Sequence, residues 1–247
     1  MTRSGRGDYM PLFLGLYLGH VLGDFAFQPG RLVVAKRRGI AGMLVHTSIV
    51  TACTALVNLG DIGSRWPAVA LASLAHLAIE YLTVRARKMT DATGLVVFLL
   101  DQALHITSLA LIALSLAPRS TQPIAGLWGL PLATLGVICA LVTVAFAGAI
   151  LAFEVRVATL GADAPAQPIL RFDGARFYGM LERSLALSVA IIAPSPIVGA
   201  LVFVPRLVFA QRQPPVSRTH HTTDAAVGLV LCTVVWALLV ALVMANS

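Results

Sequence analysis

Charged residues are scarce in this sequence. Asp, Glu, Lys and Arg make up 12% of its 247 residues, whereas an ordinary soluble domain has about 25%. Hydrophobic residues make up 58%, and the mean hydropathy is +0.86. This composition excludes an ordinary soluble domain and predicts an integral membrane protein.

Paired cysteines and common catalytic motifs are also missing. The three cysteines, Cys53, Cys139 and Cys232, stand singly in separate apolar segments. Neither a disulfide framework nor a thiolate zinc site is therefore predicted. The sequence has no Gly-rich phosphate loop and no G-x-S-x-G elbow, so two common signatures of nucleotide binding and serine hydrolysis are absent.

Long apolar runs dominate the chain, and each approaches the roughly 20 residues that a membrane-spanning helix needs. We predict an all-α polytopic transmembrane helix bundle with about eight spans, or seven if "APSP" is a kink. The ionisable residues inside the apolar runs are concentrated in the first part of the chain. We therefore predict two halves, a four-helix membrane half at 1–118 that carries these residues and an apolar four-helix membrane half at 119–247. The predicted spans are 10–28, 40–59, 66–84, 94–117, 126–153, 176–193, 196–210 and 223–245.

The net charge of +7 comes from basic residues that are unevenly distributed. If the N-terminus lies outside, 14 of the 18 Lys and Arg residues fall in cytoplasmic loops, which is the usual bias of membrane proteins. We therefore predict membrane lipid as a partner and no nucleic acid. In the second half, we expect Glu154, Glu182 and Arg183 to be solvated or to snorkel towards water at helix ends or in these loops. The sequence does not indicate an oligomeric state.

The first half places ionisable residues inside its apolar runs, in a repeated spacing. "HVLGD", "HLAIE" and "DQALH" each hold a histidine and an acid four residues apart. Residues at i and i+4 share one helix face, so each pair can present two ligands to one point. "AGMLVHTSIV" adds a further histidine. The complete set is His20, Asp24, His46, His76, Glu80, Asp101 and His105.

The members of this set also lie at similar predicted depths. Asp24 is seven residues before Arg31, and Glu80 is five residues before Arg85. Because a helix rises about 1.5 Å per residue, the whole set falls within the cytoplasmic half of the bilayer. Side chains from four helices can therefore converge.

Burying these carboxylates is unfavourable, by about 2.5 to 3.5 kcal/mol for each acid at a membrane centre. A divalent metal compensates most directly, since imidazole and carboxylate suit zinc, iron or manganese. We predict a divalent ion, zinc before iron or manganese, with all seven residues as candidate ligands. The set would suit two ions that share a carboxylate. It would also suit one ion whose ligands are held by outer residues such as Gln28 and Gln102. Hydrogen bonds that merely hold the bundle together are the structural alternative.

Four segments of the first half carry a family resemblance: "GHVLGDFAFQPGRLVVAKRRG", "LVHTSIV", "AHLAIEYLTVRARK" and "FLLDQALHITSLAL". Over about residues 12–112 they resemble a bacterial membrane family labelled domain of unknown function 3307. Its pattern is H-x-x-G-D-F-x-x-Q, H, H-x-x-x-D and D-Q-x-x-H, and Glu80 replaces an expected Asp. The resemblance implies a membrane fold with a shared polar core and no particular activity. With the charge bias, it leads us to expect a multi-pass protein of the bacterial inner (cytoplasmic) membrane.

The cluster leads us to expect an intramembrane metal-dependent enzyme, most simply a hydrolase of a lipid-like substrate near the cytoplasmic leaflet. A bound ion lowers the pKa of water to about 7, and Glu80 or Asp24 would take the proton. A proton- or metal-coupled transporter is the first alternative, because buried acid–histidine chains also serve transport. A non-catalytic membrane scaffold, whose basic loops bind anionic lipid or a partner, is the second.

Overall fold

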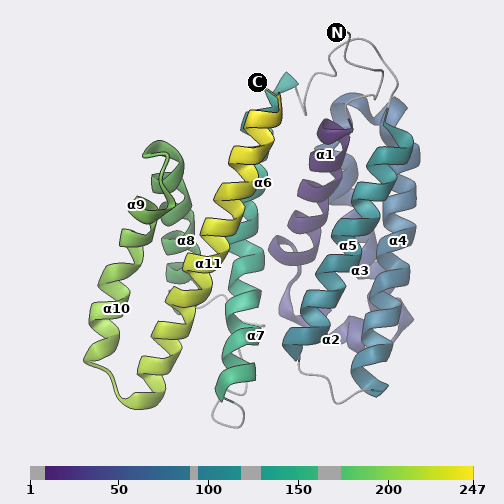
Figure 1. Cartoon of the computed structure of the whole chain (residues 1–247). Coiled ribbons are helices and arrows are strands. Elements are labelled where there is room, and N and C mark those ends of the chain that lie inside the picture. Colours follow the sequence, from purple (N-terminus) through teal and green to yellow (C-terminus); the bar gives the residue numbers. More distant parts are fainter. Residues whose placement is uncertain (1–8, 90–93, 118–128, 161–173, 247) are drawn as a thin grey trace. The chain divides into compact units, whose positions relative to one another are not determined.

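The structure is a computed structural model that describes residues 9–89, 94–117, 129–160 and 174–246. Within these ranges the regular structure is helical and no strand occurs, which confirms the all-α prediction (Figure 1). The elements are α1 (Met10–Val21), η1 (Leu22–Ala26), α2 (Gly30–Arg38), α3 (Ile40–Val57), η2 (Leu59–Asp61), α4 (Ile62–Met89), α5 (Gly94–Leu116), α6 (Leu132–Val142), η4 (Thr143–Ala147), α7 (Gly148–Leu160), α8 (Gly174–Ile192), α9 (Pro196–Ala200), η6 (Leu201–Phe203), α10 (Val204–Gln211) and α11 (Pro215–Asn246).

Several of these helices are long and apolar enough to cross a membrane. By length and composition five qualify, and a sixth is added if Met10–Ala26 and Gly30–Arg38, which meet at a 95° bend, count as one span. The chain is therefore a multi-pass membrane protein. The segments at 176–193 and 196–210 are also largely helical, but neither qualifies as a complete crossing, so the count of eight stays a prediction. The five are Ile40–Val57, Leu59–Arg87, Gly94–Leu116, Leu132–Leu160 and Pro215–Ala245.

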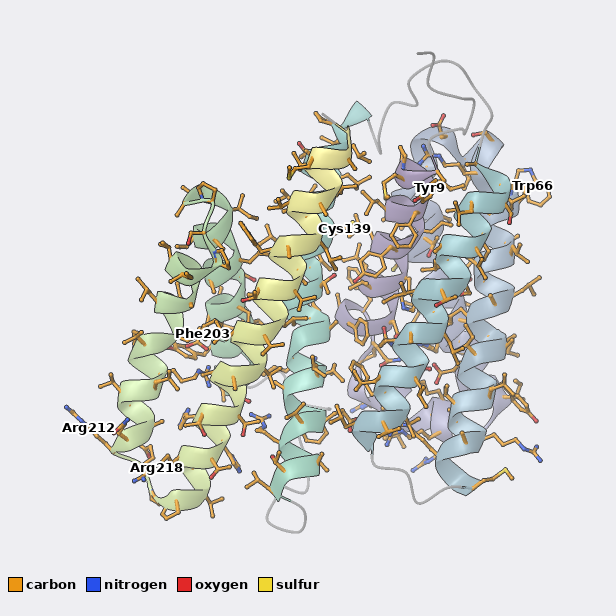
Figure 2. All side chains as sticks on the ribbon, viewed as in Figure 1. Tyr9, Trp66, Cys139, Phe203, Arg212 and Arg218 are labelled. Atoms are coloured by element: carbon orange, nitrogen blue, oxygen red, sulfur yellow. The ribbon has the colours of Figure 1, made fainter. Side chains whose placement is uncertain are left out.

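Large apolar side chains lie on the outside of these helices. On α5, Leu100, Leu104 and Leu111 are exposed, whereas Leu109 is buried. Trp66 of α4 also points outward (Figure 2). Extended apolar surface of this kind marks an interaction site on a soluble protein, and on membrane-spanning helices it is the surface that contacts lipid.

The chain forms two compact units, and each has its own apolar core. The first unit comprises the described residues of Met1–Ala92 and Leu99–Cys139, and the second those of Thr93–Phe98 and Ala140–Ser247. The core of the first unit joins α1, α4 and α5 through Leu12, Leu16, Ala68, Val69, Ala72, Leu109, Ile112 and Ala113. The core of the second is Ala140, Val144, Ala186, Leu187, Phe203, Ala225 and Cys232.

In the first unit, three glycines bring α1 and η1 very close to α3. Gly15, Gly19 and Gly23 follow one another at intervals of four residues. A Cβ atom at Gly19 would collide with the backbone of Thr54, and one at Gly23 would meet Val50. Small residues at such intervals are typical of tightly packed membrane helices. This close packing brings His20 and Asp24 beside α3, which carries His46.

The chain changes direction after η1, where the amide of Phe27 donates to the carbonyl of Leu22 over 2.8 Å. This i→i+5 bond makes η1 a π-helical turn, a feature frequent at functional sites. Residues 29–39, predicted as a loop, instead contain the helix α2. That prediction is wrong because Leu32 and Val33 are buried and give the basic segment an apolar face.

Substituting alanine for Gly19 tests the close packing of α1 on α3. We expect Gly19→Ala to lower the free energy of unfolding by about 1–3 kcal/mol, because added core atoms force the two backbones apart. The measurement is the thermal unfolding midpoint of the purified protein in detergent. Gly63→Ala in α4 is the matched control, since its Cβ would meet no atom within 4 Å. Equal midpoints for the two variants would contradict the packing.

Candidate functional site

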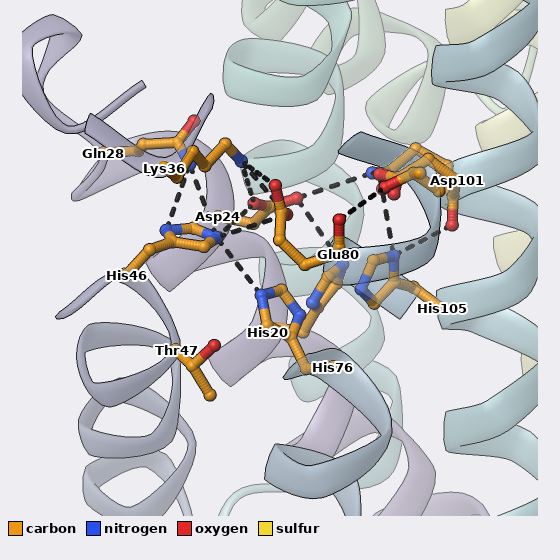
Figure 3. A network of polar contacts seen from close by, with 12 residues as sticks. His20, Asp24, Gln28, Lys36, His46, Thr47, His76, Glu80, Asp101 and His105 are labelled. Atoms are coloured by element: carbon orange, nitrogen blue, oxygen red, sulfur yellow. Dashed lines mark hydrogen bonds and ion pairs between the residues drawn. The ribbon is translucent and has the colours of Figure 1, made fainter. Parts of the chain in front are cut away.

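The seven residues singled out by their spacing converge inside the first unit (Figure 3). They come from α1 and η1, α3, α4 and α5. All of them except Asp101 are buried. The convergence predicted from depth and spacing is therefore present in the structure.

Three of these residues surround the Nε2 atom of His46, which is the fourth member of the set. This nitrogen lies 3.1 Å from Asp24 Oδ1, 3.1 Å from His76 Nε2 and 3.8 Å from Glu80 Oε2. One ligand atom from each of the four residues lies within 4.8 Å of the others. We call this set, Asp24, His46, His76 and Glu80, the acidic position.

The amide of Gln28 determines which nitrogen of His46 carries the hydrogen. All of its partners are satisfied when its oxygen accepts from His46 Nδ1 at 3.0 Å and from Lys36 Nζ at 2.8 Å, while its nitrogen donates to the Asp24 carbonyl at 3.2 Å. His46 Nδ1 is then protonated, so the neutral ring presents a lone pair at Nε2. That lone pair faces two carboxylates, which are also acceptors. A bound cation would accept this lone pair and contact both carboxylates.

A second set of possible metal ligands consists of three histidines. His20, His76 and His105 place one ligand atom each within 4.8 Å of one another. Their ring centroids are 4.6 to 5.3 Å apart. His20 Nε2, His76 Nδ1 and His105 Nε2 are buried and have no hydrogen-bonding partner among the described residues. We call this set the tri-histidine position.

The i,i+4 pairs behave differently from one another. His76 and Glu80 both belong to the acidic position, as the spacing predicts. His20 and Asp24 belong to different positions, and His20 Nε2 is 4.0 Å from Asp24 Oδ2. The two side chains nevertheless remain neighbours, so the spacing brings them together even though they are assigned to different sets.

Asp101 lies beside the two positions and belongs to neither. Its Oδ2 accepts from Gln102 Nε2 at 2.9 Å and lies 3.6 Å from His105 Nδ1. The same Gln102 nitrogen reaches Asp24 Oδ2 at 3.4 Å. Asp101 and Gln102 therefore orient the residues that surround them, as Gln28 does for His46. This arrangement agrees with the expected outer role of the two amides.

Lys36 is a member of the site that the sequence did not predict, because it stands in a basic run assigned to a solvated loop. Its ammonium lies 3.1 Å from both carboxylate oxygens of Glu80 and 3.9 Å from Asp24 Oδ1. The available signal was its spacing from Leu32, since residues at i and i+4 share a helix face and Leu32 is buried.

The charges of the site do not balance. Asp24, Glu80 and Asp101 carry three negative charges when ionised, and among the described residues paired with them Lys36 carries one permanent positive charge. With neutral imidazoles the site is left with two negative charges. Buried charge without a partner is costly, so this arrangement favours binding of a dipositive ion.

Comparison with known protein families identifies the part of the chain that holds the site. Residues 12–125 match the family described as "Protein of unknown function (DUF3307)". This part of the chain is similar to that family. The match includes all seven residues of the predicted set and confirms the resemblance, but the family has no assigned activity. No match is found among curated proteins or among solved structures.

The second unit contains a different polar cluster. Asp224 accepts two hydrogen bonds from Arg156 Nη1, at 3.0 and 2.9 Å, and one from Arg206 Nη1 at 3.2 Å. Arg206 Nε also donates to Glu182 Oε2 at 2.6 Å. These ion pairs match each carboxylate with a guanidinium group, unlike the unbalanced site of the first unit.

The prediction that Glu154, Glu182 and Arg183 are solvated is wrong, because all three are buried. Arg183 Nε donates to the Val144 carbonyl at 2.7 Å, and its Nη2 donates to the Ala145 carbonyl at 3.2 Å. Both carbonyls belong to the π-helical turn η4, where the α-helical pattern of hydrogen bonds is interrupted. Arg183 thus satisfies backbone groups inside the second unit.

Removing Arg206 tests whether the second cluster is structural. We expect Arg206→Leu to lower the free energy of unfolding by about 3–5 kcal/mol, because Glu182 is left as a buried unpaired charge. Thermal unfolding in detergent measures the loss. The double variant Glu182→Leu/Arg206→Leu should recover part of it, while Arg212→Leu, at an exposed arginine (Figure 2), serves as the control. A double variant as unstable as the sum of its single variants would contradict the pairing.

Proposed function

We propose that the first unit is an intramembrane metal-dependent enzyme, a hydrolase acting on a lipid-like substrate. The main support is the lone pair of His46 Nε2, which faces the carboxylates of Asp24 and Glu80 and the ring of His76. Zinc suits this mixed nitrogen and oxygen set best, and iron or manganese are alternatives. The charge bias and the family resemblance support a location in the bacterial inner membrane, with the site near the cytoplasmic leaflet.

The distances at the acidic position support ion binding with little rearrangement. A tetrahedral zinc ion has bonds of about 2.0–2.1 Å, so its ligand atoms lie about 3.3 Å apart. The separations of 3.1, 3.1 and 3.8 Å around His46 Nε2 are close to this value. One dipositive ion also neutralises the two excess negative charges of the site.

Each residue has a role in the proposed hydrolysis. His46, His76 and Asp24 would hold the ion, which would supply a water activated for attack. Glu80 would accept a proton from that water, and Lys36 Nζ lies 3.1 Å from its carboxylate. The Lys36 ammonium also lies where it can stabilise negative charge that develops on the substrate. Because the site lies between membrane helices, an amphipathic ester is the substrate class that reaches it most directly.

A proton-coupled transporter is the second candidate, supported by the continuity of the polar contacts. They run from Lys36 through Glu80, His46 and Asp24 to Gln102 and Asp101. The two ends are more exposed than the interior, with side-chain exposures of 13% for Lys36 and 16% for Asp101. The ionisable groups of this chain could relay protons, with the Gln102 amide as the hydrogen-bonding link between Asp24 and Asp101.

Metal analysis separates these candidates. We expect protein purified without chelator to contain zinc, iron or manganese by mass spectrometry, and His46→Ala to contain less of it. Glu80→Gln should retain more metal than His46→Ala and lower hydrolysis of a panel of lipid esters about 10²–10⁴-fold, as expected for loss of a general base. Protein without any of these metals, even after incubation with each, would favour proton transport, which flux into proteoliposomes would then measure.

Lys36 provides a second test, because its positive charge opposes the binding of a cation. We expect Lys36→Met to raise the affinity of metal-free protein for Zn²⁺ at least about tenfold, or about 1.4 kcal/mol, as measured by calorimetric titration in detergent. Arg38→Met, at an exposed residue of the same helix, should leave the affinity unchanged. Equal affinities for both variants and wild type would mean that the ion does not bind beside Lys36.

A further inference from the structure

We propose that the site holds two metal ions, the second at the tri-histidine position, and that the imidazole ring of His76 bridges them. This inference rests on the proposed function, because it adds an ion to the same site. It starts from the three buried ring nitrogens that have no partner, His20 Nε2, His76 Nδ1 and His105 Nε2.

Hydrogen bonds elsewhere in the cluster determine that two of these nitrogens carry lone pairs. His105 Nδ1 lies 2.8 Å from the Asp101 carbonyl; since a carbonyl only accepts, this nitrogen is protonated and Nε2 has the lone pair. His46 Nε2 carries a lone pair, as argued above, and lies 3.1 Å from His76 Nε2. His76 Nε2 therefore donates to it when no ion is present, which leaves a lone pair at His76 Nδ1.

Two acceptors of the tri-histidine position thus lie in a buried space with no donor from the described residues. Buried polar atoms of proteins nearly always have a partner. A single water could donate to two of these nitrogens, whereas a metal ion accepts a lone pair from all three at once when His20 also presents one at Nε2. Three histidine ligands with a fourth position left for water is an established arrangement of catalytic zinc. The position therefore has the ligands of a metal site that is separate from the acidic position.

His76 belongs to both positions through its two nitrogens. Its Nε2 lies beside His46 in the acidic position, and its Nδ1 has no partner on the other side of the ring. Coordination at both nitrogens requires the ring to lose its remaining proton to bulk water and become an imidazolate. This negative charge, together with hydroxide from an ion-bound water, compensates for the second dipositive ion.

The experiment counts ions in wild type and in variants that remove one position at a time. Metal-free wild type titrated with Zn²⁺ should bind two ions per chain, by calorimetry and by mass spectrometry of the dialysed protein. His105→Ala and the conservative His105→Gln should each bind one, and His46→Ala should also retain one. His220→Ala, at a histidine in the second unit, should bind two. Thermal unfolding of each variant confirms that it is folded.

Loading with Cu²⁺ tests the bridge. An imidazolate between two Cu²⁺ ions couples their unpaired electrons, so wild type should give a weaker electron paramagnetic resonance signal per ion than His105→Ala. Two ions with uncoupled spectra would overturn the bridging role of His76. One ion in both wild type and His105→Ala would overturn the second site and leave the proposed function intact. No ion in any of them would overturn the proposed function itself.

Discussion

Carboxylates removed from water set the main constraint on the first unit. Asp24 and Glu80 are buried among membrane-spanning helices, where an isolated charge is unfavourable by several kcal/mol. The surrounding structure brings a partner to each of these carboxylates. The glycines of α1 and η1 allow α3 to approach closely enough to bring His46 to Asp24, and α2 folds back so that Lys36 reaches Glu80.

The two units solve the problem of buried charge in different ways. In the second unit, Glu182 and Asp224 each contact a guanidinium group directly, and Arg183 satisfies backbone carbonyls. In the first unit, acceptors face one another and only Lys36 among the contacting residues is a permanent cation. A set of acceptors without sufficient donors is suited to binding a ligand, whereas a balanced set of ion pairs is suited to holding helices together.

The sequence predicted the helical class and the meeting of His20, His46, His76 and His105, because apolar length and residue spacing are local properties of the chain. It did not predict that Lys36 joins them, since a basic run next to a membrane helix normally remains solvated. It also misplaced Glu182 and Arg183, whose partners Arg206 and Val144 are distant in sequence. Pairing between distant segments leaves little trace in local composition, whereas the regular spacing of residues within one helix can be read directly from the sequence.

The π-helical turn η1 makes the site sensitive to the length of the chain as well as to its side chains. A π turn accommodates one more residue than an α turn. A deletion inside η1, for example of Phe25, would shorten this turn and change the direction in which the chain enters α2, which carries Lys36. Scanning by single deletions would reveal this dependence, which substitution alone does not address.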